Sequence, residues 1–246
     1  MEKIYGFVPM AVREGQTLDF ERAARACHEA ILPNIAGTQH YEWFLSEDGR
    51  KGYVIEVYDD PAGVELHGAM LAGKVAGVMQ HAQMRITFAG QVPDALQERM
   101  RRKLGETDYA GPRAFGRMDD PVPHRVPPPG DERVYALAWF RARPGQAQRL
   151  RELARQSWER ACTVDPGTLG YEWFFDPEGN GMALDVYRDP EAMLAHMANC
   201  GPVMSEILAV ADSRTIVFGT LPPVIEARLR PELGITRFPR RLHGIG

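Results

Sequence analysis

The hydrophobic and polar positions in the first half of the chain switch between strand and helix periods in a fixed order. Strands are predicted for four apolar runs, at residues 4–12, 38–45, 51–58 and 84–91. Helices are predicted for two stretches with apolar residues three or four apart, at residues 17–31 and 60–80, with the second broken near Gly73. The resulting order, β-α-β-β-α-β, is typical of a ferredoxin-like α+β module.

The second half of the chain repeats this pattern. The segment from Gly37 to Gly49 aligns with the segment from Gly167 to Gly179, and seven of the 13 positions are identical. After a one-residue deletion the correspondence continues for three polar pairs: Glu56 and Asp185, Tyr58 and Tyr187, His67 and His196. A period this long indicates a duplicated domain rather than a solenoid repeat. The second helical region of the second copy is expected to break near Pro202.

Proline content marks the boundary between the copies. Six prolines fall between Gly105 and Glu132, a density that disfavours helices and central strands. The predicted organisation is therefore a first module, a proline-rich extended linker, a second module and a C-terminal tail, at residues 1–104, 105–132, 133–232 and 233–246.

The predicted strands are apolar on both faces. In residues 51–58, Tyr53, Ile55 and Val57 alternate with Val54 and Tyr58. A sheet that is apolar on both faces must be covered on both faces, and helices on one side leave the other open. We therefore predict that the two modules pack sheet to sheet as an intrachain pseudo-dimer, which leaves further homo-oligomerisation open.

Composition and charge narrow the classes of partner. The net charge of −4 provides no basic field for nucleic acid, and no polybasic run suggests a membrane surface. The amino-terminal residues lack an apolar leader and no run is long enough to span a bilayer, so the expected location is the cytoplasm. Three cysteines without close spacing predict neither a disulfide framework nor a metal site.

The stretch from Tyr53 to His67 resembles the antibiotic-biosynthesis monooxygenase family of the dimeric α/β-barrel superfamily. Family members carry a strand that ends in an aromatic residue, an acidic turn and a helix with an inward histidine. The resemblance implies an enzyme that needs no flavin, metal or haem and that oxidises phenolic or hydroquinone-like aromatics with O₂, often polyketides in antibiotic biosynthesis. Two features depart from the family: the strand ends in Tyr58 rather than the frequent Trp, and two modules are fused in one chain.

The repeated polar set is the candidate catalytic site: His67, His196, Tyr58, Tyr187, Glu56 and Asp185. Each histidine lies on the apolar stripe of its predicted helix, so it points towards the sheet. An imidazole that titrates near neutrality suits a general base for a phenolic proton, although a buried histidine that is only structural explains the pattern equally well. A carboxylate in the middle of a strand requires a partner or a wet cavity.

Four aromatic residues are candidates for substrate binding: Trp43, Trp173, Tyr41 and Tyr171. Each pair shares a strand face and would stack on a flat ligand, while packing in the core is the competing interpretation. Three functions remain open. The chain is a cofactor-free monooxygenase that takes O₂ and a hydrophobic aromatic substrate, a non-catalytic small-molecule-binding or scaffold protein, or a haem-binding relative in which a histidine ligates the iron.

Overall fold

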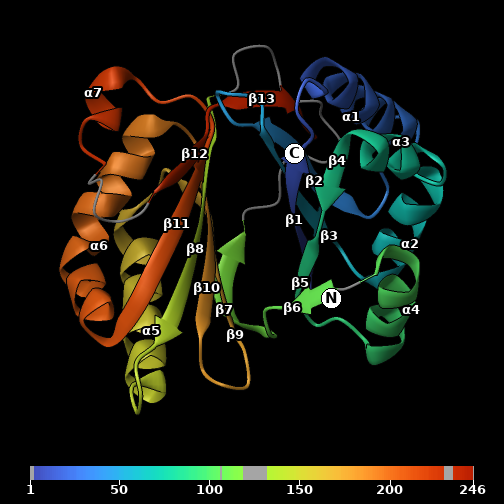
Figure 1. The fold of residues 1–246 in the computed structure, drawn as a ribbon. Coiled ribbons are helices and arrows are strands. Elements are labelled where there is room, and N and C mark those ends of the chain that lie inside the picture. Colours follow the sequence, from blue (N-terminus) through green and yellow to red (C-terminus); the bar gives the residue numbers. More distant parts are fainter. Residues whose placement is uncertain (1–2, 106, 119–131, 230–234, 246) are drawn as a thin grey trace. The chain divides into compact units, whose positions relative to one another are not determined.

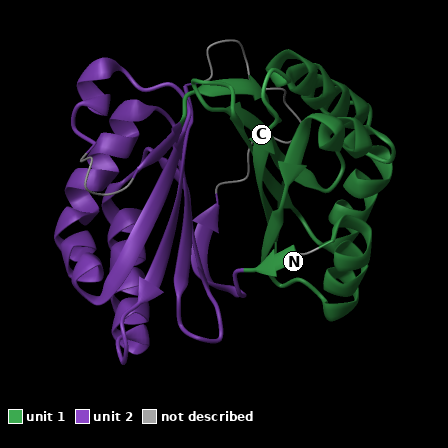
Figure 2. Cartoon of the chain, viewed as in Figure 1, with its two compact units in different colours: residues 1–109, 120–129, 238–246 green, residues 110–119, 130–237 purple. Residues whose placement is uncertain are grey.

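The computed structural model describes residues 3–105, 107–118, 132–229 and 235–245 (Figure 1). The chain divides into two compact units (Figure 2). Unit 1 comprises residues 1–109, 120–129 and 238–246, and unit 2 comprises residues 110–119 and 130–237. No helix in the described ranges is long and apolar enough to cross a membrane.

Unit 1 is one sheet with helices over one of its faces (Figure 1). The strands are β1 (Ile4–Val12), β2 (Thr38–Leu45), β3 (Lys51–Tyr58), β4 (Ala82–Met84), β5 (Ile86–Gly90), β6 (Thr107–Tyr109) and β13 (Arg240–His243). They are ordered β13-β2-β3-β1-β5-β6, and β4 also pairs with β1. The helices are α1 (Thr17–Ile31), α2 (Pro61–Met70), α3 (Lys74–His81) and α4 (Asp94–Leu104).

Unit 2 repeats this plan with its own edge strands. Its strands are β7 (Arg113–Met118), β8 (Val134–Ala142), β9 (Thr168–Phe175), β10 (Gly181–Tyr187), β11 (Ala211–Phe218) and β12 (Thr236–Phe238). They are ordered β12-β11-β8-β10-β9-β7. Its helices are α5 (Ala147–Val164), α6 (Pro190–Val210) and α7 (Pro223–Glu226). The predicted α+β order of both modules is confirmed.

The second helical region differs between the copies. In unit 1 it breaks at Gly73 as predicted, because this residue has a φ of 79°, which glycine adopts without strain. The predicted break near Pro202 is wrong, since α6 continues through that residue. Pro202 occupies the position that corresponds to Gly73, and its ring fixes a negative φ that cannot form the left-handed turn. The chain therefore stays helical and loses one backbone hydrogen bond.

The segments between and after the modules carry strands. Strands β6 and β7 lie in the range expected to be a bare connector, where β6 extends the sheet of unit 1 beside β5 and β7 extends the sheet of unit 2 beside β9. Strand β13, from the expected tail, pairs with β2. Residues 119–131, which hold most of the linker prolines, lie outside the described residues. The predicted module boundaries and the sheet-to-sheet packing stay predictions.

Burial follows the apolar pattern of the strands. In β3 the side chains of both faces are buried, as shown by exposed fractions of 0% for Ile55, 1% for Val57 and 2% for Val54. The face of the unit 1 sheet that meets the helices forms one apolar core with Phe20 of α1 and Val64 of α2. The candidate polar residues are set inside this core.

Candidate active site

Helix α2 and strand β3 position the polar set of unit 1. Asp60 caps the helix by accepting a hydrogen bond of 2.9 Å from the backbone N–H of Gly63, and Pro61 follows at the first helical position. This start directs His67, two turns later, towards the sheet. Glu56 and Tyr58 share one face of β3 because they are two residues apart. The structure thus brings together three residues that the sequence singled out.

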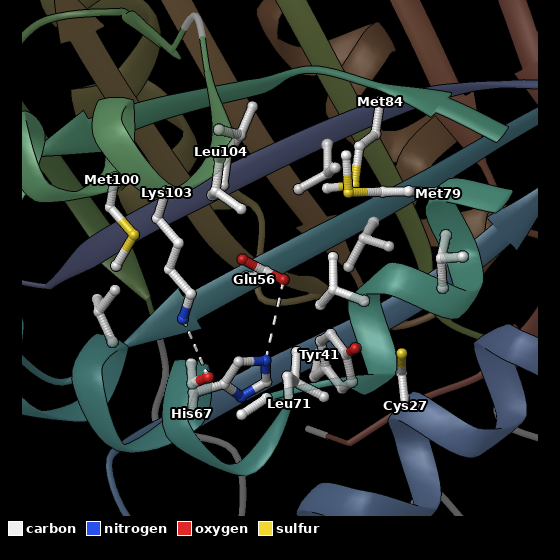
Figure 3. A pocket seen from close by; sticks show the side chains of 18 of the residues that line it. Cys27, Tyr41, Glu56, His67, Leu71, Met79, Met84, Met100, Lys103 and Leu104 are labelled. Carbon is white, nitrogen blue, oxygen red and sulfur yellow. Dashed lines mark hydrogen bonds and ion pairs between the residues drawn. The ribbon is translucent and has the colours of Figure 1, made fainter.

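These three side chains surround a small polar spot. The Tyr58 hydroxyl donates a hydrogen bond of 2.8 Å to Glu56 Oε2. His67 Nε2 lies 4.0 Å from Glu56 Oε1 (Figure 3). The other ring nitrogen, Nδ1, lies 3.3 Å from Thr38 Oγ1. The edge-on rings of Tyr41 and Tyr58 enclose the imidazole, with centroids 4.6 and 5.2 Å away. His67 Nε2 is buried and has no hydrogen-bond partner among the described residues.

Gly6 makes room for the Glu56 side chain. The two residues face each other across β1 and β3, and a Cβ at position 6 would lie only 2.6 Å from Glu56 Oε2. In unit 2 the corresponding pair is Ala136 opposite Asp185. The copy with the longer acid has no side chain opposite it, and the copy with the shorter acid has a methyl group there. The two sites therefore fill the same space with different pairs.

A cavity of about 260 Å³ opens beside the polar spot of unit 1. Its wall is largely apolar and includes Tyr41 and Trp43, the predicted substrate-binding aromatics, together with Glu56 and His67 (Figure 3). Lys103 of α4 is the single Lys or Arg among the lining residues that the structure describes, and its Nζ lies 3.4 Å from the Gly68 carbonyl oxygen. Lys103 is solvent-exposed, and nothing in the helical pattern of this segment indicated that it would line a cavity.

Burial sets the protonation states in unit 1. It raises the pKa of Glu56 to about 7, against the opposing effect of the hydrogen bond from Tyr58. It lowers the pKa of His67 to about 4, because no charged partner offsets the loss of solvation. The pKa values of Tyr41 and Tyr58 lie well above their ordinary value because both hydroxyls are buried. At neutral pH the imidazole is therefore neutral and its Nε2 is open to a proton, but a pKa of about 4 makes His67 a weaker base than the imidazole near neutrality that the sequence predicted.

In unit 2 the corresponding histidine lies between two carboxylates. His196 Nδ1 is 3.0 Å from Asp165 Oδ2, and His196 Nε2 is 3.8 Å from Asp185 Oδ1. The Asn199 side-chain amide donates to the other oxygen of Asp165. The ring of Tyr187 lies 5.3 Å from the imidazole, so the predicted set of Asp185, Tyr187 and His196 is also assembled.

The second imidazole has the opposite charge preference. Burial is the largest single influence and lowers the pKa of His196, but the hydrogen bonds to Asp165 and Cys200 and the nearby Asp185 carboxylate together outweigh it and raise this pKa to about 10. Burial also acts to raise the pKa of Asp165, and the hydrogen bonds from His196 and Asn199 reverse that and hold it below its usual range. Burial raises the pKa of Asp185 to about 6. His196 is therefore an imidazolium at neutral pH and does not have a free site for a proton.

The origin of this difference can be read in the repeat. The residue that corresponds to Asp165 in the first copy is Ile35, and the residues that correspond to Asn199 and Cys200 are Met70 and Leu71. These substitutions are visible when the two copies are aligned, but the contact between Asp165 and His196 is not. The two sites share a polar set and differ in what surrounds it.

The cavity of unit 2 is the larger of the two, at about 430 Å³. Tyr171 and Trp173 contribute to its wall. Trp173 is completely buried and stacks on Phe140 with the ring centroids 5.0 Å apart, so it also serves the core. The Tyr171 hydroxyl is engaged with Ser157 Oγ at 2.9 Å. Both Tyr171 and Trp173 therefore have packing contacts within unit 2 in addition to lining its cavity.

Comparisons with known proteins agree with the duplicated module. The family model described as antibiotic biosynthesis monooxygenase matches residues 7–70 and again residues 133–201. A search of curated proteins found no match. Among solved structures, a proposed monooxygenase from Lactobacillus acidophilus NCFM has a TM-score of 0.60 at 13% identity, with 87% of this chain and 92% of the other covered.

A second solved structure supports the same fold over a similar length. A proposed monooxygenase from Fusobacterium nucleatum has a TM-score of 0.65 at 12% identity, with 87% of this chain and 89% of the other covered. Identities this low show the fold alone, whereas the two family matches together cover more than half of the chain. The chain belongs to the antibiotic biosynthesis monooxygenase family, as a tandem pair of its domains.

Proposed function

We propose that this protein is a cofactor-independent monooxygenase that oxidises a phenolic or hydroquinone-like aromatic with O₂, and that unit 1 carries the proton transfer. Membership of the family supports the reaction class. The observation that carries the assignment to unit 1 is the buried His67 Nε2, which has no hydrogen-bond partner among the described residues and belongs to a side chain in the wall of an apolar cavity.

Proton transfer is the step that these residues can perform. Thr38 Oγ1, at 3.3 Å from His67 Nδ1, accepts a hydrogen bond in the tautomer in which Nδ1 carries the hydrogen, and in that tautomer Nε2 is the free acceptor. A substrate hydroxyl in the cavity would give its proton to Nε2. The protonated form of Glu56, which accepts the Tyr58 hydrogen at Oε2, would donate a hydrogen bond to the resulting phenolate oxygen, and the apolar wall would keep competing water away.

The oxidation itself belongs to the substrate and O₂. The electron-rich phenolate passes one electron to O₂, and the resulting substrate radical and superoxide combine through a carbon–oxygen bond. For a substrate whose hydroxyl is the enol form of a ketone with a ring CH₂ group, the proton given to His67 is one of the two CH₂ hydrogens, and the peroxide forms on a carbon that keeps the other. The proton held by His67 returns to the outer peroxide oxygen, and loss of the remaining C–H hydrogen with cleavage of the O–O bond leaves a carbonyl on that carbon and releases one water. One O₂ is consumed for each quinone formed.

Unit 2 has a different part in this proposal. Its imidazolium is held by Asp165 and faces Asp185, so it is not available as a base. The larger cavity and the occupied histidine favour ligand binding without proton abstraction. Non-catalytic binding of an aromatic molecule is therefore the second candidate function, and it applies to unit 2.

Oxygen consumption with single variants tests the proposal. Purified full-length protein, with an absorption spectrum that shows neither flavin nor a Soret band, is supplied with anthrones and hydroquinones while O₂ uptake and quinone formation are followed. His67→Ala should lower turnover by roughly 10²–10⁴-fold, the usual effect of losing a general base. His196→Ala is the matched control and should keep most of the activity. Equal loss in both variants, or none in His67→Ala, would overturn the assignment to unit 1.

A further inference from the structure

Two side chains of unit 2 that have no counterpart in unit 1 form a cluster with His196, outside the proposed chemistry. Asp165 precedes β9, and His196 and Cys200 lie one turn apart on the same face of α6. All three are buried, with exposed fractions of 4%, 5% and 1%. Each offers one ligand atom, and the three atoms lie within 4.8 Å of one another. We propose that these residues form a site for a single Zn²⁺ ion in unit 2.

The distances between the three atoms fit one small cation. His196 Nδ1 lies 3.0 Å from Asp165 Oδ2, and Cys200 Sγ lies 3.9 Å from that oxygen and 4.0 Å from that nitrogen. Tetrahedral zinc with ligand distances of about 2.0–2.3 Å has ligand–ligand edges of roughly 3.3–3.6 Å. The nitrogen–oxygen edge must open by a few tenths of an ångström and the two sulfur edges must shrink by about as much. Side-chain rotation alone accommodates such changes.

The surroundings of the three ligands resemble the outer shell of a zinc site. Ligating histidines generally donate their second ring N–H to a carboxylate, and here His196 Nε2 faces Asp185 Oδ1 at 3.8 Å. Asn199 donates to the Asp165 oxygen that the cation would not use. His196 and Cys200 also line the cavity of unit 2, so the ion has an entry path and solvent can fill a fourth position.

The chemistry of the donors selects among the cations. One thiolate, one imidazole and one carboxylate at tetrahedral spacing suit Zn²⁺, whereas Mg²⁺ and Ca²⁺ require more oxygen ligands. Zn²⁺ displaces the hydrogen at His196 Nδ1 and the thiol hydrogen of Cys200, so binding releases protons, and the charges of −1 on Asp165 and Cys200 then neutralise the divalent ion inside the protein. Unit 1 has Ile35 and Leu71 at the two corresponding positions, so the first copy lacks the site. The proposal is independent of the oxygenase chemistry assigned to unit 1.

Metal titration of the full-length protein tests this inference. After treatment with a chelator, Co²⁺ is added as a spectroscopic probe for Zn²⁺. The expected result is one ion per chain with a thiolate-to-cobalt charge-transfer band and tetrahedral visible bands, all removed by one equivalent of Zn²⁺. Cys200→Ser and Asp165→Asn should lose tight binding, and Asp185→Asn should weaken it by roughly 10–100-fold through the outer shell.

The exposed Cys162 provides the matched thiol control, since Cys162→Ser should leave the cobalt spectrum and the stoichiometry unchanged. Circular dichroism of each variant establishes that it is folded, and Zn²⁺ should raise the Tm of the wild type and of Cys162→Ser but not of Cys200→Ser. Absence of stoichiometric binding to the folded wild type, or a charge-transfer band that persists in Cys200→Ser, would overturn the proposal. In that case the cluster is only a buried ion pair beside a thiol.

Discussion

Filling the space opposite Glu56 is the most informative single change. In Gly6→Ala the new methyl carbon would lie 2.6 Å from Glu56 Oε2, so the carboxyl group must move. The atom that must move is the end of a flexible side chain with a cavity beside it, so the backbone can keep its register. The change then removes the 2.8 Å hydrogen bond from Tyr58 and leaves a buried hydroxyl without its partner. That loss costs about 1–3 kcal/mol of unfolding free energy.

The second copy supplies the compensating change. Unit 2 has Ala136 opposite Asp185 at the register position where unit 1 has Gly6 opposite Glu56. Glu56→Asp alone leaves a small gap, whereas Gly6→Ala with Glu56→Asp reproduces the pair of unit 2. We therefore expect the double variant to be more stable than the sum of the single effects by about 1–2 kcal/mol, a coupling typical of residues in contact.

Urea unfolding of the four proteins measures this coupling. The protein has two units, so the transitions are followed by both tryptophan fluorescence and circular dichroism, and free energies are compared only where the two probes coincide. O₂ uptake on the same samples reports whether the displaced carboxyl group also disturbs the site. A Gly6→Ala variant as stable as the wild type, or strictly additive effects in the double variant, would refute the reasoning about the space beside Glu56.

Three further changes follow from the structure. Burial raises the pKa of Glu56 from 4.5 to about 7, so the folded state holds this proton more tightly than the unfolded state does. The resulting stability is present below pH 4.5 and is lost as pH rises towards 7. Glu56→Gln should remove this loss of about 3 kcal/mol from the curve of unfolding free energy against pH, and an unchanged slope would contradict the prediction. Asp165→Asn removes the partner of a buried imidazolium and should lower the free energy of unfolding in denaturant by about 3–5 kcal/mol. Ile35→Asn, at the corresponding position of unit 1, breaks no ion pair and serves as the control. Equal losses in the two variants would argue against the ion pair. Lys103→Ala should raise KM for a quinol that carries a carboxylate and leave KM for an uncharged quinol unchanged in steady-state O₂ uptake, since Lys103 is the single Lys or Arg among the described residues that line this cavity. A parallel rise in KM for both substrates would count against this role.

Much of the fold was predictable from the sequence, because the duplicated pattern repeats each period and each turn signal. Gly73 and Pro202 show where the prediction stopped. Both residues were expected to break a helix, but only glycine adopts the left-handed φ found between α2 and α3, and α6 stays helical through its proline. The short strands β6 and β7 were not predicted, because the linker at residues 105–132 was judged by its overall proline content. Most of these prolines follow the two strands in the sequence.

The residues that come together at each site were predictable from the sequence, but the charges of His67 and His196 were not. The helix period placed His67 and His196 towards the sheet, and the strand period placed their acids beside them. The charge of each imidazole depends on Asp165, which lies 31 residues before His196 in the chain and reaches it only through the fold. A periodic pattern within one element contains no information about such a contact, although the substitution of Ile35 by Asp165 between the copies was visible in the sequence.

The central claim is that duplication left one neutral and one charged imidazole in sites built from the same residues. Nuclear magnetic resonance of the full-length protein, treated with a chelator and carrying labelled histidine side chains, tests it directly, with His67→Gln and His196→Gln to assign the signals. The account predicts that the ring of His67 stays neutral from pH 8 down towards its pKa of about 4, while His196 stays an imidazolium up towards its pKa of about 10. Two histidines that titrate together near the ordinary value of 6.5 would contradict the account.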